Sequence, residues 1–165
     1  MTANAVLYGS IWIALALFAA GEIGRRPAPG HRRAAAWAWP ASATGLAIAV
    51  THVLIALHSF DDWNHALAKE AAARQTEAIY GVAWGGAVFV NYVFLSAWAA
   101  DLACWRRDAL RGAIVGTPGA GRLVLRTFYV VMVANGAVIF AAPNRRWMGL
   151  ALLAALAVAW RRGKG

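Results

Sequence analysis

Cysteine is almost absent from this chain, which has a single one, Cys104, among 165 residues. A lone cysteine excludes an internal disulfide and any paired-cysteine redox or zinc motif. Cys104 is therefore expected to be a small helix residue and nothing more.

Acidic residues are also scarce, with 7 Asp and Glu against 16 Lys and Arg, so the formal net charge is +9. Such a charge is compatible with nucleic acid binding, but the arginines lie in short clusters between apolar runs and do not line one face. Clusters of this kind are typical of the flanks of membrane spans. We therefore expect no nucleic acid partner.

Polar surface is the third shortage. Hydrophobic residues make up 61% of the chain and the mean hydropathy is +0.54, whereas a soluble domain of this size needs more polar surface. The length predicts one domain, residues 1–165. Together these features predict an all-α fold, a polytopic membrane helical bundle in contact with the lipid bilayer.

Long apolar runs locate the expected membrane spans. They predict five transmembrane helices, at about 5–24, 41–59, 79–104, 123–142 and 147–160. Because the last run is short, four spans plus an interfacial helix is the alternative. An outer polar helical excursion is expected at about 61–78, since Ser59 and Asp62 fit a capping box.

Two inner connectors are expected, at 25–33 and at the glycine-rich stretch 116–121. The second has the GxxxxG spacing of a phosphate-binding loop. It lacks the rest of that motif, because Arg122 and Leu123 stand where Lys and Ser or Thr are required.

The distribution of Lys and Arg predicts the orientation. With five spans and the N-terminus outside, twelve of the 16 basic residues fall in inner segments, and the other four are Lys69, Arg74, Arg145 and Arg146. Positive charge marks the cytoplasmic side. The sequence thus predicts an integral protein of a bacterial-type plasma (inner) membrane, with the N-terminus outside and the C-terminus cytoplasmic.

A candidate metal site lies at the junction between the second expected span and the polar excursion. At about 100° per residue, His58 and His65 share one stripe of a continuous helix, with Asp61 and Asp62 within one turn of them. Imidazole and carboxylate ligands suit zinc, iron, manganese or copper. The alternative is that the aspartates cap the outer helix while the histidines lie in headgroup water.

Other polar residues are expected to join helices. His52 lies deep in an apolar run, so it should face the bundle interior, where Asn91 and Asn135 lie at similar depth. At the inner surface, Glu22 is expected to pair with Arg25 or Arg26, and Asp101 with Arg106 or Arg107.

Two features predict helix packing. Gly81 and Gly85 form a GxxxG motif, which lets another helix approach closely. A stripe repeats every seven residues, formed by Trp84, Asn91, Trp98 and Trp105. Such a stripe is typical of a face that packs on a neighbouring helix.

Two functions from different classes follow, and whether the chain is an enzyme stays open. One is a small integral membrane protein with an outward-facing metal site at His58, Asp61, Asp62 and His65, loaded with a divalent transition metal. The other is a non-catalytic accessory subunit of a larger membrane complex. It would bind a membrane protein partner, or a second copy, through Gly81/Gly85 and the tryptophan faces.

Overall fold

A computed structural model describes residues 3–26, 34–111 and 120–161. Every regular element in these ranges is helical: α1 (Ala3–Arg25), α2 (Ala38–Phe60), α3 (His65–Tyr80), α4 (Ala87–Leu110), α5 (Ala120–Ala134), the π-helix η1 (Asn135–Ile139), the 3₁₀ turn η2 (Pro143–Arg145) and α6 (Arg146–Trp160). The predicted all-α class is confirmed. The expected connectors fall largely on 27–33 and 112–119, which lie outside the described residues.

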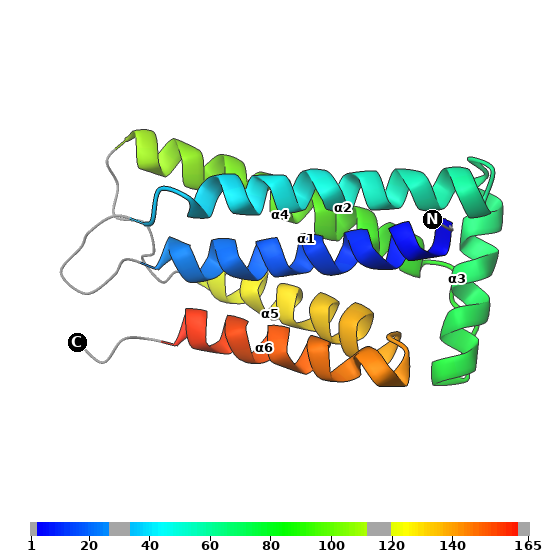
Figure 1. Cartoon of the computed structure of the whole chain (residues 1–165). Coiled ribbons are helices and arrows are strands. Elements are labelled where there is room, and N and C mark those ends of the chain that lie inside the picture. Colours follow the sequence, from blue (N-terminus) through cyan, green and yellow to red (C-terminus); the bar gives the residue numbers. More distant parts are fainter. Residues whose placement is uncertain (1–2, 27–33, 112–119, 162–165) are drawn as a thin grey trace.

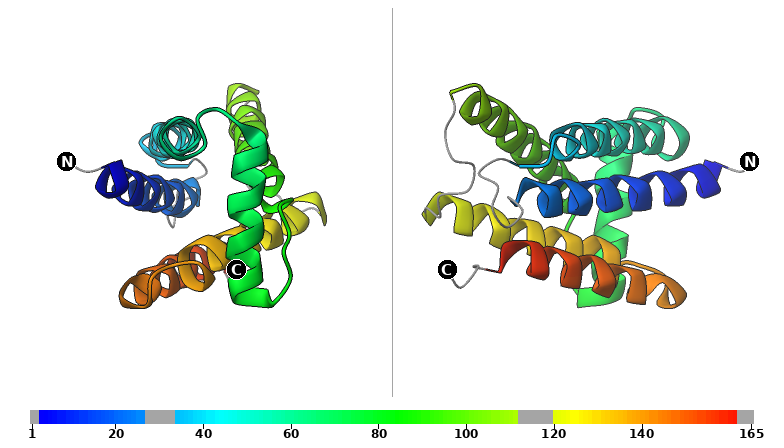
Figure 2. Two further views of the ribbon diagram at one scale, coloured as in Figure 1. Left: turned by 90° about the vertical axis from the view of Figure 1, so that its right-hand side faces the viewer. Right: turned by 60° about the vertical axis from the view of Figure 1, so that its left-hand side comes forward.

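Five helices run lengthwise in one bundle, and α3 stands across one end of it (Figure 1). The view on to that end shows α3 passing in front of α4 and α5, with α1 and α2 to its left (Figure 2, left). We call this end the α3 end. The opposite end, where α1, α4 and α6 finish and α5 begins, carries Arg25, Arg26, Arg106, Arg107, Arg111, Arg122, Arg126 and Arg161, and we call it the arginine end.

Four helices in the described part of the chain are long and apolar enough to cross a membrane: Leu7–Arg25, Ala38–Phe60, Ala87–Leu110 and Ala120–Ile139. The fourth consists of α5 and η1 together. These four helices indicate a small helical membrane protein whose apolar surface contacts lipid.

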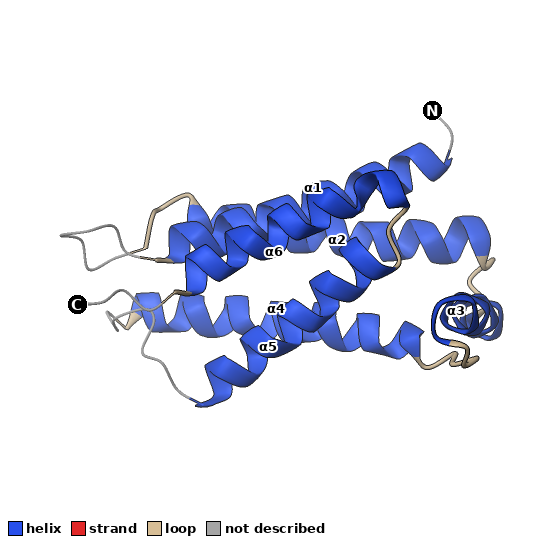
Figure 3. Cartoon of the chain, turned by 90° about the horizontal axis from the view of Figure 1, so that it is seen from below, coloured by secondary structure: helices blue, strands red, loops and turns tan. Residues whose placement is uncertain are grey.

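The fifth predicted span, α6, has only 15 residues, so it is about 22 Å long at about 1.5 Å per residue. It nevertheless runs lengthwise beside α1, unlike α3, which is seen end-on when the bundle is viewed from below (Figure 3). Leu156 of α6 is 1% exposed. Helix α6 is thus an integral part of the bundle, with the direction of the spans and not that of a surface helix.

The core is aromatic. The Phe18 ring lies edge-on to Trp98 and Tyr129, at 4.9 Å between centroids in each case, so α1, α4 and α5 meet around it. Trp98 and Trp105 are both buried, which confirms that this part of the predicted stripe packs on neighbouring helices. Trp84 precedes α4 and is exposed, so it does not belong to that face.

The turn between α2 and α3 differs from the prediction. Asp62 and Trp63 have positive φ values of 48° and 60°, a conformation that ends a helix. The first residue of α3 is His65, and the Asn64 side chain accepts a hydrogen bond from the Ala66 N–H at 2.9 Å. The predicted Ser59/Asp62 capping box is therefore wrong, because Ser59 still belongs to α2 and Asn64 is the N-cap.

The expected GxxxG helix motif is also wrong. Gly81 ends α3 with φ 73°, and Gly85 lies in the loop before α4. Gly85 does permit a close approach, since a side chain there would meet the Lys69 carbonyl oxygen at 2.7 Å. The contact of Gly85 is with the adjoining helix α3 and not with a second span, whereas Gly81 has no such close neighbour.

Candidate functional site

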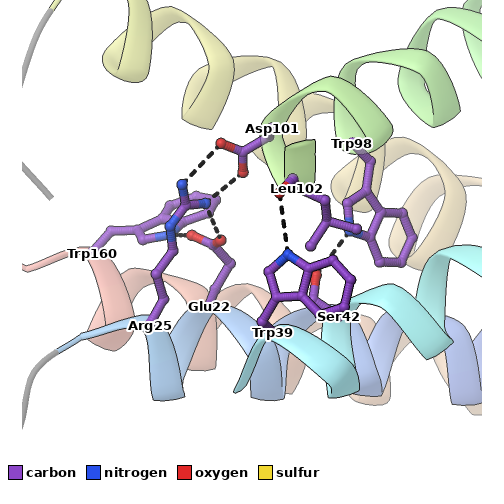
Figure 4. A network of polar contacts seen from close by, with 8 residues as sticks. All are labelled: Glu22, Arg25, Trp39, Ser42, Trp98, Asp101, Leu102 and Trp160. Atoms are coloured by element: carbon purple, nitrogen blue, oxygen red, sulfur yellow. Dashed lines mark hydrogen bonds and ion pairs between the residues drawn. The ribbon is translucent and has the colours of Figure 1, made fainter. Parts of the chain in front are cut away.

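Three charged side chains meet between α1 and α4 at the arginine end; Glu22 and Arg25 are buried and Asp101 is partly buried. Glu22 and Arg25 lie one turn apart near the end of α1, and Asp101 faces them from α4 (Figure 4). Arg25 donates from Nη1 to Asp101 Oδ2 at 2.5 Å and from Nη2 to Asp101 Oδ1 at 3.1 Å. This is the two-pronged geometry that fits a guanidinium to a carboxylate.

Glu22 and two indoles complete the network. Arg25 Nη1 also donates to Glu22 Oε1 at 3.2 Å, and the Trp160 indole N–H donates to Glu22 Oε2 at 2.6 Å. The Arg25 guanidinium lies over the Trp105 ring, 4.6 Å from its centroid, a favourable cation–π position. Residues from α1, α4 and α6 thus surround one buried cation.

Two further indole hydrogen bonds attach α2 beside this network. Trp39 donates to the Leu102 carbonyl at 3.1 Å, and Trp98 donates to the Ser42 hydroxyl at 2.9 Å. Both link α2 to α4 (Figure 4). The site therefore ties four helices together. The charged groups of this site hold the helices together, because an arginine stays protonated in proteins and each carboxylate here already accepts a hydrogen bond from Arg25.

The sequence predicted half of this arrangement. The pairing of Glu22 with Arg25 is confirmed, and both side chains are buried within the chain. The pairing of Asp101 with Arg106 or Arg107 is wrong, because Asp101 binds Arg25 of another helix while Arg106 stacks over Trp39. A signal was available, since Arg25 and Asp101 both lie near the arginine-rich flank of their own apolar run.

His52 joins two helices as expected, but not with the expected partners. Its Nδ1 lies 3.0 Å from the Leu7 carbonyl and 3.1 Å from the Ser10 hydroxyl, so it connects α2 to α1. Asn135 instead accepts a hydrogen bond from the Tyr80 hydroxyl, and Asn91 is exposed. The anticipated cluster of His52, Asn91 and Asn135 is therefore not formed.

The four proposed metal ligands lie around the turn that separates α2 from α3: His58 is in the last turn of α2, Asp61 and Asp62 are in the turn, and His65 begins α3. The Trp63 indole donates to His58 Nδ1 at 3.1 Å, and His65 Nε2 lies 3.2 Å from the Tyr92 hydroxyl. Because the chain turns at Asp62, the continuous helical stripe assumed for His58 and His65 does not exist. No group of three or more His, Cys, Asp and Glu side chains in the described ranges is arranged to hold a metal ion.

The His58 contact has a consequence for ligation. A neutral imidazole that accepts at Nδ1 carries its proton on Nε2, so neither nitrogen is then free to bind a metal. Metal binding by His58 requires the Trp63 indole to withdraw first.

Comparisons with protein families, curated proteins and solved structures find no match to this chain. Its functional assignment therefore depends on the fold and on the contacts above.

The buried network predicts an asymmetric response to mutation. Arg25→Gln removes the cation and leaves Glu22 and Asp101 buried side by side, so we expect a loss of about 3–5 kcal/mol of unfolding free energy. Unfolding in detergent micelles, followed by circular dichroism, measures it.

The control is Glu70→Gln. Glu70 pairs with Arg74 at 2.9 Å, but both side chains are 65% exposed, so we expect a change of about 0.5 kcal/mol or less. Equal effects of the two substitutions would show that the Arg25 network does not hold the bundle together.

Proposed function

We propose that this protein is a non-catalytic accessory subunit of a larger assembly in a bacterial-type plasma membrane, with its N-terminus outside and its C-terminus in the cytoplasm. The charge distribution supports the orientation. Eight arginines of the described residues belong to the arginine end, whereas Lys69, Arg74, Arg145 and Arg146 belong to the α3 end. By the positive-inside rule, the arginine end is cytoplasmic and α3 lies outside.

The accessory role is supported by the exposure of one side of α5. Only 17% of the α4 span and 17% of the α5 span are buried within the chain, compared with 44% of the α1 span. A surface hollow of about 440 Å³ follows α5, and it is lined by Leu123, Val124, Thr127, Phe128 and Val131. Helices associate in membranes through van der Waals packing, and a hydroxyl such as that of Thr127 can add a hydrogen bond across the contact.

The partner surface that we propose differs from the one that the sequence indicated. Gly85 packs on α3, and Trp98 and Trp105 are buried inside the bundle, so these residues are already occupied. Leu123, Val124 and Val131 remain 67%, 70% and 54% exposed. A membrane protein partner, or a second copy of this chain, would therefore bind at α5.

Cysteine labelling tests the orientation. In a Cys104→Ser background, a cysteine at Ala78 on α3 should react with a membrane-impermeant maleimide added to intact cells. A cysteine at Ala109, at the end of α4, should react only after the membrane is opened. Labelling of both from the same side contradicts the proposed topology.

Photo-crosslinking tests the assembly. A photoreactive amino acid at Val124 or Val131 should give one discrete protein adduct in native membranes, because a partner helix fills the hollow. The same residue at Val50 of α2, which is also exposed, is the matched control and should give far less. If Val124 and Val131 yield only lipid adducts, the accessory role is wrong.

The second candidate function is the outward-facing metal site. It is favoured by the position of His58, Asp61, Asp62 and His65, which lie together in sequence at the α3 end, with both histidines and Asp62 exposed. A divalent zinc, iron, manganese or copper ion would draw the two imidazoles and a carboxylate together after displacement of Trp63.

Elemental analysis after mild purification and metal resupply tests this candidate. We expect one ion per chain in the wild type and none in His58→Ala or His65→Ala, with His52→Ala as the control that keeps its metal. Trp63→Phe should bind more tightly, since it removes the competing indole. A wild type without stoichiometric metal rules the site out.

A further inference from the structure

A second hollow lies on the surface between α1 and α6, close to the arginine end. It has a volume of about 360 Å³ and is lined by Ile23, Arg26, Ala154, Ala155, Val158 and Ala159. Five of these six residues are apolar, and three are alanines whose short side chains leave room between the helices. The hollow therefore presents an apolar trough with a single cationic side chain.

Arg26 differs from its neighbour Arg25 in having no acidic partner among the described residues. Its Nη1 instead lies 3.4 Å from the Val158 carbonyl oxygen, which holds the guanidinium at the edge of the trough. Glu22 and Asp101, the nearby acids, are already bound to Arg25. The positive charge at the trough is thus not neutralised within the described part of the chain.

Other cations lie at the same end of these helices. Arg161 follows α6 directly and is exposed, and the Arg126 guanidinium lies 5.4 Å from the centroid of the Trp160 ring. A ligand at this place would therefore need an anionic head near Arg26 and an apolar body along α1 and α6.

We propose that the α1–α6 trough binds one anionic phospholipid of the cytoplasmic leaflet. The phosphate lies against Arg26, and one acyl chain lies along Ile23, Ala155 and Val158. The trough runs along α1 and α6, which are parallel to the long axis of the bundle, and acyl chains in a bilayer would run in the same direction. A lipid with a choline head is disfavoured, because its ammonium group would face several arginines. The trough lies on α1 and α6 and the other hollow on α5, so lipid binding does not depend on the accessory role, although the choice of the cytoplasmic leaflet rests on the proposed orientation.

Native mass spectrometry of the full chain, released from bilayers of equal phosphatidylglycerol and phosphatidylcholine, tests the site. The wild type should retain one phosphatidylglycerol, with at least about a fivefold preference over phosphatidylcholine, the factor expected from one basic side chain at a membrane surface. Arg26→Gln should abolish this preference. Arg111→Gln is the matched control, since Arg111 is an exposed arginine at the same end but outside the trough.

Ala155→Phe should fill the trough and lower the retention of both lipids. If this variant fails to fold, Arg26→Gln decides the matter, because Arg26 is exposed and can be replaced without disturbing the core. Equal retention of the two lipids by the wild type overturns the proposal. So does an equal loss in Arg111→Gln, which would indicate diffuse attraction. Disulfide-linked dimers of an Ala155→Cys, Cys104→Ser protein in membranes would also overturn it, because a second copy would then occupy the trough.

Discussion

The bundle depends on the neutralisation of Arg25. A guanidinium cannot lose its proton at ordinary pH, and leaving it buried and unpaired is too costly for a small protein. Every conformation in which Arg25 is buried must therefore bring carboxylates to it, and the chain offers Glu22 one turn away and Asp101 on α4. Because Trp160 of α6 then binds Glu22, one electrostatic requirement fixes three helices. Such a pair adds little stability relative to apolar packing, but it selects one arrangement against others that apolar contacts alone would allow.

Apolar packing supplies the remaining constraint through close backbone approach. A side chain at Gly45 of α2 would meet the Ala14 carbonyl at 2.9 Å, and one at Gly149 of α6 would collide with the Ala137 carbonyl. Lipid is as apolar as a helix surface, so the hydrophobic effect does little to bring helices together there, and their association depends on close contacts of this kind. The second contact lies on η1, where the helix widens to π geometry. The hairpin of α5 and α6 thus closes where a glycine faces a locally widened helix.

The sequence was most informative where one length, the thickness of the bilayer, determines the structure. The lengths of the apolar runs predicted five spans, since bilayer thickness sets such lengths; four of the resulting helices are long and apolar enough to cross a membrane, and the fifth, α6, is shorter. Local backbone conformation was harder to predict: the sequence analysis chose Ser59/Asp62 as the cap, whereas the positive φ values at Asp62 and Trp63 end α2 and leave Asn64 as the N-cap of α3. The partner of Asp101 was missed because spacing along one helix identifies neighbours on that helix, whereas Arg25 lies 76 positions away. The same limit applies to the metal hypothesis, since a stripe through His58 and His65 presupposes a helix that the turn interrupts.

Consecutive arginines at the end of α1 show how helix geometry divides one charge cluster into two environments. Successive residues point about 100° apart, so Arg25 turns inward to Asp101 while Arg26 turns outward to the α1–α6 surface. Because Glu22 and Asp101 both bind Arg25, Arg26 has no acidic partner among the described residues. Had Asp101 paired with Arg106 on its own helix, Arg25 would have lost its strongest partner and the outer surface would have carried less net charge. The inward salt bridge therefore shapes the arginine end in two ways: it joins α1 to α4, and it leaves Arg26 without an acidic partner among the described residues.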